Sequence, residues 1–374
     1  MVALVGASHP GAGQLALALE EEPGVDRILA LTRAELPMLG PKLEYVPAAP
    51  GEERFAEALA EADTVVMFPL IDATDRSEAG RRDQVLEGVR STLKASTAAT
   101  TLVLWSSGIV YGAHPDNPVP LTEASPLRPN ADFAPAGLLA EVERLVLDAA
   151  GSAGLPWTAS PDSPAHSAGS GNGRRGTVVL RGAAIWAPSW GTFLSRLLQA
   201  PAIAAVRGYD PPVQGLDPAD AASALVLATR GELSGLYNVA PDDWVLASEA
   251  ARIAGRRRLE VPERVAFTTA ERLGRVGVSS AVSGELHYHM HPWVLDNRRI
   301  RAAGWAPGHT TAAAMAAAGR DLPEGVHVGR IQVRRSDIYR GAAAGLALVA
   351  ALAVARRQRR ARRSPSRGGA GRML

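Results

Sequence analysis

The stretch Thr101-Leu-Val-Leu-Trp-Ser-Ser-Gly-Ile-Val-Tyr-Gly112 says more about the fold than any other part of the chain. Its first half, Thr101 to Trp105, is a short run of β-branched and large apolar residues, which predicts a buried strand. Its second half opens into the small residues Ser106, Ser107 and Gly108, which are typical of a loop. A buried strand that ends in such a loop favours a sheet whose strand ends surround a ligand.

A similar unit begins the chain. Val2 to Val5 is apolar and leads into Gly6-Ala-Ser-His-Pro-Gly-Ala-Gly13, after which residues 14–21 have helical character. Glycines at a strand–helix turn allow backbone amides and the helix N-terminus to approach a pyrophosphate closely. In a Gly-x-x-Gly-x-x-Gly count from Gly6, His9 and Ala12 take the second and third glycine positions, and Gly11 and Gly13 are available only if the register shifts. The candidate cofactor-binding residues of this turn are therefore Gly6, Ser8, His9, Gly11 and Ala12. The alternative is a turn that keeps the fold and binds no nucleotide.

Strands and helices alternate along most of the remaining sequence. We expect further strands at 27–31, 64–68, 101–105 and 177–180. We expect helices at 53–61, 84–95 and 137–150, followed by helices of a smaller lobe near 217–229, 246–254 and 311–319. This alternation predicts βαβ units and a parallel, doubly wound α/β sheet.

These motifs resemble the extended short-chain dehydrogenase/reductases, the NAD-dependent epimerase/dehydratase family. The resemblance spans about residues 1–320, with weaker matches in family order at 181–188, 214–222, 235–240 and 296–305. It implies a Rossmann-like sheet with a small C-terminal α/β lobe, NAD or NADP as cofactor, and nucleotide sugars or related carbonyl and hydroxyl compounds as substrates. It also implies that Ser107 binds and polarises the substrate.

On this basis we divide the chain into four parts. Residues 1–158 form the Rossmann-like nucleotide-binding part, and 159–176, rich in glycine, serine and proline, form a flexible loop or insertion. Residues 177–325 hold the remaining strands and the small substrate lobe. Residues 326–374 hold an apolar helix at about 338–355 and an arginine-rich tail.

The family's acid–base pair, Tyr-x-x-x-Lys on the helix after the serine motif, has no counterpart in this sequence. The chain has two lysines, Lys42 and Lys94, and both precede the motif. No tyrosine lies between Tyr111 and Tyr209. In the family the tyrosine exchanges a proton with the substrate, and the lysine lowers its pKa and holds the nicotinamide ribose.

Alignment of the helix by its Glu141-Val-Glu-Arg144 end places Pro135 at the tyrosine position and Leu139 at the lysine position. Proline has no proton to give, and leucine cannot bind ribose hydroxyls. Ser107 can orient a carbonyl but supplies no proton near neutral pH. Asp132 and Glu141 are the acids that we consider as substitutes, and no spacing favours either one.

Arg33 follows the second strand, where the resemblance places the adenosine ribose. An acid there favours NAD, whereas an arginine can meet the 2′-phosphate of NADP. The alternative is an exposed loop arginine. The stretch after the third strand, Val46-Pro-Ala-Ala-Pro50, lacks the aspartate that the family often carries near the adenine.

His287, His289 and His291 alternate along the sequence. On a strand they would share one face, as metal ligands can, or they would simply be the outward residues of a half-buried strand. No acidic residue completes a ligand set, and we predict no metal. The absence of cysteine excludes disulfides and thiolate metal sites.

Charge is unevenly distributed along the chain. The formal net charge is +2, but residues 330–374 contain twelve arginines and one acid, so the rest of the chain is acidic. An acidic body argues against nucleic-acid binding by the folded part. The start of the chain has no basic segment before its apolar run, which predicts a cytoplasmic protein.

The tail permits a second location. Gly341 to Ala355 is apolar and uncharged, and a cluster of arginines follows it. A helix of that length reaches about 22 Å, less than the ~30 Å hydrocarbon core of a bilayer. Residues 338–363 therefore predict contact with an anionic membrane or, alternatively, an alanine-rich helix with a basic end.

Three functions are compatible with these observations. The first, which the residues favour, is a catalytically impaired family member that binds a dinucleotide or small ligand as a sensor or scaffold. The second is an active NAD(P)-dependent oxidoreductase or nucleotide-sugar epimerase/dehydratase with a non-standard acid. The third is a membrane-surface interaction protein that retains only the fold. None of the three requires a nucleic-acid partner, and nothing in the sequence indicates an oligomeric state.

Overall fold

The computed structural model describes residues 1–33, 40–71, 78–97, 100–151, 176–190, 192–199, 202–275, 283–321, 325–328 and 331–334. The chain forms two compact units, one of residues 1–198 and 202–322 and one of residues 199–201 and 323–374. In the second unit, β12 (Gly325–Val328) and β13 (Ile331–Arg334) pair antiparallel. The predicted loop at 159–176, except Gly176, and the predicted tail from 335 onwards lie outside the described residues. Among the described residues, no helix has the length and apolar character needed to cross a bilayer.

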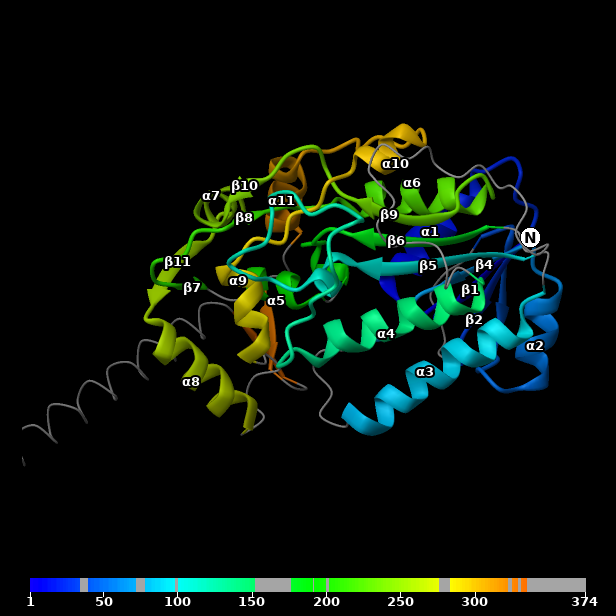
Figure 1. Cartoon of the computed structure of the whole chain (residues 1–374), viewed down its shortest axis with the longest axis horizontal. Coiled ribbons are helices and arrows are strands. Elements are labelled where there is room, and N and C mark those ends of the chain that lie inside the picture. Colours follow the sequence, from blue (N-terminus) through cyan, green and yellow to red (C-terminus); the bar gives the residue numbers. More distant parts are fainter. Residues whose placement is uncertain are drawn as a thin grey trace, which may run out of the picture. The chain divides into compact units, whose positions relative to one another are not determined.

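The first unit contains a seven-stranded sheet in the order β3-β2-β1-β4-β5-β6-β9 (Figure 1). Its strands are β1 (Val2–Val5), β2 (Ile28–Leu31), β3 (Leu43–Val46), β4 (Thr64–Met67), β5 (Thr101–Ser107), β6 (Thr177–Gly182) and β9 (Gly235–Val239). All neighbouring strands are parallel. The chain winds outward from β1 to β3 and then returns to β4 on the other side of β1. The predicted doubly wound sheet is confirmed, and the crevice at the carboxyl ends of β1 and β4 is its switch point, where such folds bind ligands.

Helices cover both faces of this sheet (Figure 1). The helices of the described residues are α1 (Pro10–Glu20), α2 (Glu53–Ala60), α3 (Glu78–Ala95), α4 (Ala134–Ala149), α5 (Phe193–Gln199), α6 (Pro218–Thr229), α7 (Ala247–Ile253), α8 (Glu263–Arg275), α9 (His287–Met290), α10 (Arg298–Ala302) and α11 (Thr311–Arg320). Helices α1 and α6 lie on one face, and α2, α3 and α4 lie on the other.

The two faces arise from the two-residue period of the strands. Leu4 of β1 belongs to the apolar cluster that includes Leu15 of α1 and Leu225 of α6. Its neighbour Ala3 belongs to the opposite cluster, with Phe55 of α2. Since both faces are buried, the central strands read as continuous apolar runs, which is why they could be found in the sequence.

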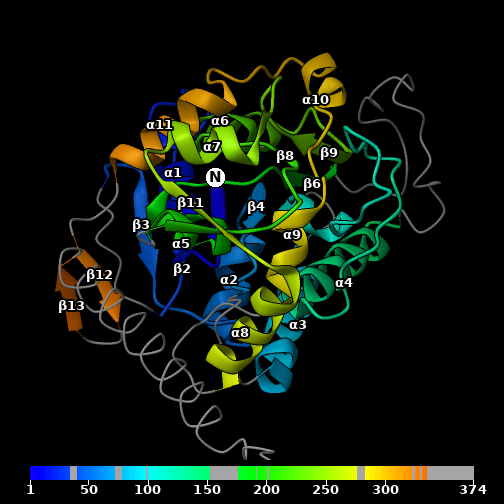
Figure 2. The ribbon, with the colours of Figure 1, turned by 90° about the vertical axis from the view of Figure 1, so that its left-hand side faces the viewer.

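A smaller group of elements lies beyond the carboxyl ends of the sheet. Strand β7 (Ala202–Val206) pairs parallel with β11 (Arg257–Val261), and β8 (Pro212–Val213) pairs antiparallel with β10 (Val245–Leu246). Figure 1 shows β7, β11, α8 and α9 at the same end of the sheet, and Figure 2, which looks at that end, shows β11, α8 and α9 toward the viewer. This group is the small lobe that the sequence predicts after the main sheet.

The predicted strand of alternating histidines is wrong. A single helical turn, α9, runs from His287 to Met290, and His291 is the extended residue that ends it. On a helix, residues four apart are neighbours. The rings of His287 and His291 accordingly stack with centroids 6.3 Å apart, while the ring of His289 packs against Phe193. The three side chains do not share a face, because a segment this short carries too little pattern to separate a strand from a turn of helix.

Other differences concern element ends. The first helix begins at Pro10, four residues earlier than predicted, because proline is well suited to a first helical turn. Strand β5 continues to Ser107, two residues beyond the predicted end at Trp105. Small hydroxyl residues can therefore extend a buried strand when, as here, a partner strand pairs with them throughout.

Candidate functional site

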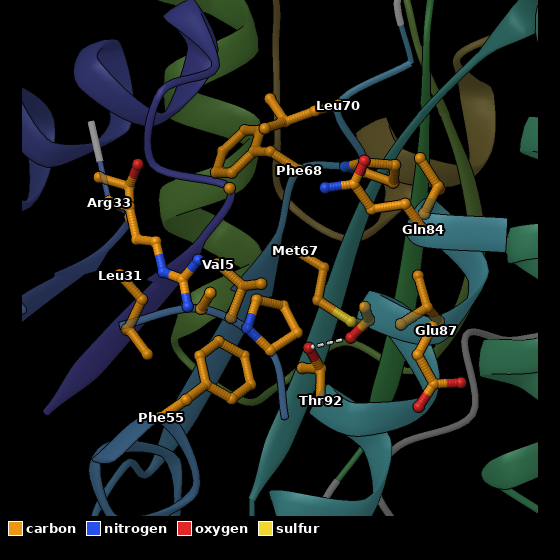
Figure 3. Close-up of a pocket in the computed structure, with 18 of the residues that line it drawn as sticks. Val5, Leu31, Arg33, Phe55, Met67, Phe68, Leu70, Gln84, Glu87 and Thr92 are labelled. Carbon is orange, nitrogen blue, oxygen red and sulfur yellow. Dashed lines mark hydrogen bonds between the residues drawn. The ribbon is translucent and has the colours of Figure 1, made fainter. Parts of the chain in front are cut away.

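Two cavities lie at the carboxyl edge of the main sheet. Cavity A, of about 640 Å³, is bounded by the ends of β1, β2 and β4, by the segment after β3 and by α3 (Figure 3). Cavity B, of about 570 Å³, is bounded by the end of β5, the start of α4 and the segment after β6. Pro69, Leu70 and Arg81 line both cavities and therefore form the boundary between them.

Cavity A is mainly apolar with polar groups at its sides. Leu31, Phe55 and Met67 form part of its apolar wall, and Arg33 and Gln84 approach from β2 and α3 (Figure 3). A mostly apolar pocket of this size with a few polar groups is typical of sites for small molecules. The switch point of the fold thus holds a cavity large enough for a ligand.

Arg33, the predicted ribose-side residue, does line cavity A. Its guanidinium forms a short hydrogen bond and ion pair with Glu52, the residue that precedes α2. The other oxygen of Glu52 accepts a hydrogen bond from the backbone N–H of Ala49 at 2.8 Å. The Ala49 N–H and the Arg33 guanidinium lower the pKa of the Glu52 carboxyl, so it carries its charge at neutral pH. The positive charge of Arg33 is therefore already matched by a carboxylate.

The backbone conformation at Gly6, the first position of the glycine turn, requires a glycine. Gly6 has φ +76°, and a Cβ there would collide with the carbonyl oxygen of Phe68. The second predicted position, His9, caps α1: its Nδ1 accepts a hydrogen bond from the N–H of Gly11 at 3.0 Å. Of the other predicted residues of this turn, Ser8 is exposed and lines cavity B, and Gly11 and Ala12 are buried in the first turn of α1.

The His9 ring is tightly packed, although part of the residue remains exposed. It stacks on Phe68 with ring centroids 5.2 Å apart, and it meets the edge of Trp190 at 5.5 Å. Burial lowers the pKa of His9 to about 4. The imidazole is therefore neutral at physiological pH and adds no positive charge to the switch point.

Cavity B brings together the three residues that the sequence assigns to the reaction site. Ser107, Pro135 and Leu139 all line it, together with aromatic residues that include Trp105 and Trp190. The Ser107 hydroxyl accepts a hydrogen bond of 3.4 Å from the N–H of Ile109. Helix α4 begins at Ala134 with Pro135 in its first turn, so the helix is retained while proline and leucine face the serine's cavity.

The acids considered as substitutes lie elsewhere. Asp132 contacts His287 with 3.1 Å between carboxylate and ring nitrogen. Glu141 forms an ion pair with Arg82 at 2.6 Å. Neither acid is among the residues that line cavity B. Within the described part of the chain, no group of three or more acidic or histidine side chains is arranged to hold a metal.

A buried polar network stands behind Ser107, and sequence reasoning missed most of it. The side chains of Glu143 and Arg181 are 0% and 1% exposed and form an ion pair at 2.6 Å. Arg181 also donates to the Tyr111 hydroxyl at 2.8 Å, and that hydroxyl donates to Asn238 at 2.8 Å. Ser106 forms a short hydrogen bond with Glu143. The sequence did contain one indication of it. Glu143 lies four residues after Leu139, so the two residues share a face of the predicted helix.

This network fixes the Ser107 loop without supplying a proton to cavity B. Burial raises the pKa of Tyr111 to about 12. Its hydroxyl is fully engaged by Arg181 and Asn238, and Tyr111 does not line the cavity. The motif tyrosine is therefore a structural residue that ties β5, β6 and β9 together.

Comparison with known proteins supports the fold. No protein-family model matches the chain. Uncharacterised proteins of Mycobacterium tuberculosis and Mycobacterium bovis are 27% identical over 326 residues, which cover 83% of this chain and 81% of theirs.

Solved structures of nucleotide-sugar enzymes have the same fold. The dTDP-glucose 4,6-dehydratase of Bacillus anthracis in complex with NAD is 13% identical, with a TM-score of 0.59 over 86% of this chain and 95% of that one. The UDP-glucose 4-epimerase of Thermus thermophilus in complex with NAD is 16% identical, with a TM-score of 0.59 over 86% and 98%. MoeE5 in complex with UDP-glucose and NAD is 17% identical, with a TM-score of 0.60 over 85% and 97%. The chain thus has the fold of NAD-dependent epimerases and dehydratases, as the resemblance implies.

Proposed function

We propose that this chain is a catalytically impaired protein with the epimerase/dehydratase fold, and that it binds a nucleotide or another small ligand as a sensor or scaffold. The observation that carries the proposal is the lining of cavity B, where Ser107 is accompanied by Pro135 and Leu139. Neither residue can exchange a proton. Loss of a general acid–base group typically lowers a rate by about 10²–10⁴.

The binding half of the proposal rests on cavity A. It lies at the switch point of the sheet, it has apolar walls for a flat base, and Arg33 and Gln84 offer polar contacts at its sides. The similar enzymes named above were crystallised with NAD. On this proposal, cavity A accommodates the base of such a ligand, and cavity B lacks a side chain that could serve as the family's acid or base.

Calorimetric titration of the full-length chain tests the binding half. We expect adenosine or at least one of NAD⁺, NADH, NADP⁺ and NADPH to bind. Gly88→Leu, which adds a side chain on α3 toward Pro50 across cavity A, is expected to abolish that binding. Gly137→Leu is the matched control, because Gly137 lies on the exposed side of α4 with open space around it. If none of the five compounds binds, the proposal is wrong.

A turnover assay tests the impairment. With UDP-glucose or dTDP-glucose and NAD⁺, we expect no product above background for the wild type and the same result for Ser107→Ala. Turnover that Ser107→Ala abolishes would instead support the active-enzyme alternative. The membrane-surface alternative depends on residues outside the described part of the chain, and truncation at 337 followed by membrane fractionation tests it separately.

A further inference from the structure

The amides that begin α1 are already used by the protein itself. His9 N–H donates to the carbonyl of Gly6 at 2.9 Å, and Pro10 has no N–H. Gly11 N–H donates to the His9 ring at 3.0 Å, and Ala12 N–H donates to the His9 carbonyl at 2.9 Å. A diphosphate at a helix N-terminus is held by such amides. Residues 9–12 therefore have no amide left to offer to a phosphate.

The space above these amides is filled as well. The His9 ring is held between Phe68 and Trp190, and the Trp190 ring also meets Trp105 at 6.1 Å between centroids. A Cβ added to Gly11 would lie only 2.8 Å from the Trp190 ring and 3.0 Å from the His9 nitrogen. A phosphate is far larger than a methyl group, so it does not fit beside Gly11 unless these rings move.

Electrostatics point the same way at the turn. The His9 imidazole is neutral at physiological pH because burial holds its pKa near 4. At the far side of cavity A, the charge of Arg33 is matched by Glu52. At the start of α1 the amides of residues 9–12 are used, and on the ribose side Arg33 is paired, so these two places are poorly suited to a strongly anionic ligand.

We propose that cavity A takes an uncharged nucleoside, a flat base with its ribose and no 5′-diphosphate, and that His9 occupies the place where the diphosphate of a dinucleotide would meet α1. The inference rests on the proposed function, since it names the ligand class of the cavity that function uses. Such a nucleoside occupies cavity A alone, whereas a dinucleotide would extend from cavity A into cavity B. The boundary of Pro69, Leu70 and Arg81 separates them.

The test is a titration series of the full-length wild type with adenosine, AMP, ADP and NAD⁺, which add phosphate stepwise to one base. We expect adenosine to bind at least about tenfold more tightly than ADP or NAD⁺, a difference of about 1.4 kcal/mol. Equal or tighter binding of ADP or NAD⁺ would overturn the inference and leave the proposed function intact. Failure of all four compounds to bind would overturn both.

Two variants of His9 distinguish the effect of the ring's bulk on NAD⁺ binding from the effect of its hydrogen bond with the Gly11 N–H. His9→Gly removes the ring and frees the Gly11 N–H, so we expect NAD⁺ to bind about tenfold more tightly than to the wild type. His9→Ser removes the ring but keeps an oxygen that can cap the same N–H, so we expect a smaller gain. Each variant is first compared with the wild type by thermal melting. If both are folded and neither gains affinity for NAD⁺, His9 does not exclude the diphosphate, and the inference is wrong.

Discussion

Cavity A and cavity B lie at the same sheet edge and share a wall, yet they differ in the groups that they offer to a ligand. Cavity A has the shape of a ligand site, and the backbone amides of residues 9–12 at the nearby helix start are already used by the protein. Cavity B contains Ser107 with the buried network behind it, and Pro135 and Leu139 in its lining cannot exchange a proton. In both cavities, residues that fix the backbone, such as Gly6 and Arg181, differ from residues that face the cavity, such as Gln84 and Pro135.

The difference shows what resists change in such a fold. A residue such as Gly6 or Arg181 is fixed by its own neighbours, because any replacement leaves a collision or an unpaired buried charge. A residue such as Gln84 is exposed at the side of cavity A, where we expect its replacement to affect a ligand more than the fold. We call residues that fix the backbone frame residues and residues that face a cavity lining residues. Substitution of a frame residue is expected to lower stability most.

The frame of cavity B depends on the Glu143–Arg181 pair. Glu143→Ala leaves Arg181 charged and 1% exposed without its partner, which we expect to cost about 3–5 kcal/mol of unfolding free energy. Glu141→Ala, two residues earlier on the same helix, breaks an ion pair with the half-exposed Arg82 and is expected to cost less than about 1 kcal/mol. Urea denaturation of the three proteins measures both values. Similar losses for the two variants would show that the network does not hold this frame.

The stability of the protein depends on pH through His9, which lines cavity B at the start of α1. Its native pKa of about 4 lies below the value of about 6.5 for an unfolded histidine, so the unfolded chain binds the proton first. Stability from this group is complete above pH 6.5 and is lost as the pH falls towards 4, by up to about 3 kcal/mol. His9→Asn keeps a capping oxygen and removes the titration.

We therefore expect the stability of wild type to fall more steeply than that of His9→Asn between pH 7.5 and 4.5 in urea melts. His289, whose pKa burial also lowers to about 4, is present in both proteins and contributes equally to both slopes. Parallel slopes for the two proteins would mean that the His9 ring is not buried as tightly as its contacts indicate.

The glycine turn tests the frame of cavity A. Gly6→Ala introduces a Cβ that collides with the Phe68 carbonyl at φ +76°, and we expect a loss of about 2–3 kcal/mol. Gly51→Ala, at φ +90° with open space around it, carries only the backbone penalty of about 1 kcal/mol. The difference between the unfolding midpoints of Gly6→Ala and Gly51→Ala in urea measures the contribution of the collision to the loss of stability. Equal losses would show that the turn has room to relax.

The same separation explains what could be predicted from the sequence. The central strands and the helices α2, α6 and α11 were found because burial on one or both faces leaves a pattern in consecutive residues. The fold could be predicted because Gly6 and residues 106–112 form the loops that follow β1 and β5, and the backbone of these loops requires particular residue types. The residues at Pro135 and Leu139 were found by alignment to a family motif, and they line the same cavity as Ser107.

Features that depend on contacts between distant segments could not be found in this way. The His9 ring packs against Phe68 and Trp190, which lie 59 and 181 residues further along the chain. The residues next to His9 in the sequence therefore do not predict these contacts. Arg33 follows β2 and Glu52 precedes α2, so their ion pair forms only when the fold brings the two segments together. The sequence alone therefore does not predict it. The short turn at 287–290 was misjudged because its four residues are too few to show a period.

The smallest predicted effect concerns the mouth of cavity A. Glu52→Gln removes the carboxylate beside Arg33 while keeping the side chain's size and an oxygen for the Ala49 N–H. The freed guanidinium can then meet a phosphate on the ribose, so we expect 2′-AMP to gain about three- to tenfold in affinity while adenosine is unchanged. Glu53→Gln, one residue further along in α2, is the control for a general change in charge. An equal gain for both variants would assign the effect to net charge, and a gain for Glu52→Gln alone would show that the Glu52 carboxylate is what keeps Arg33 from a phosphate on the ribose side of cavity A.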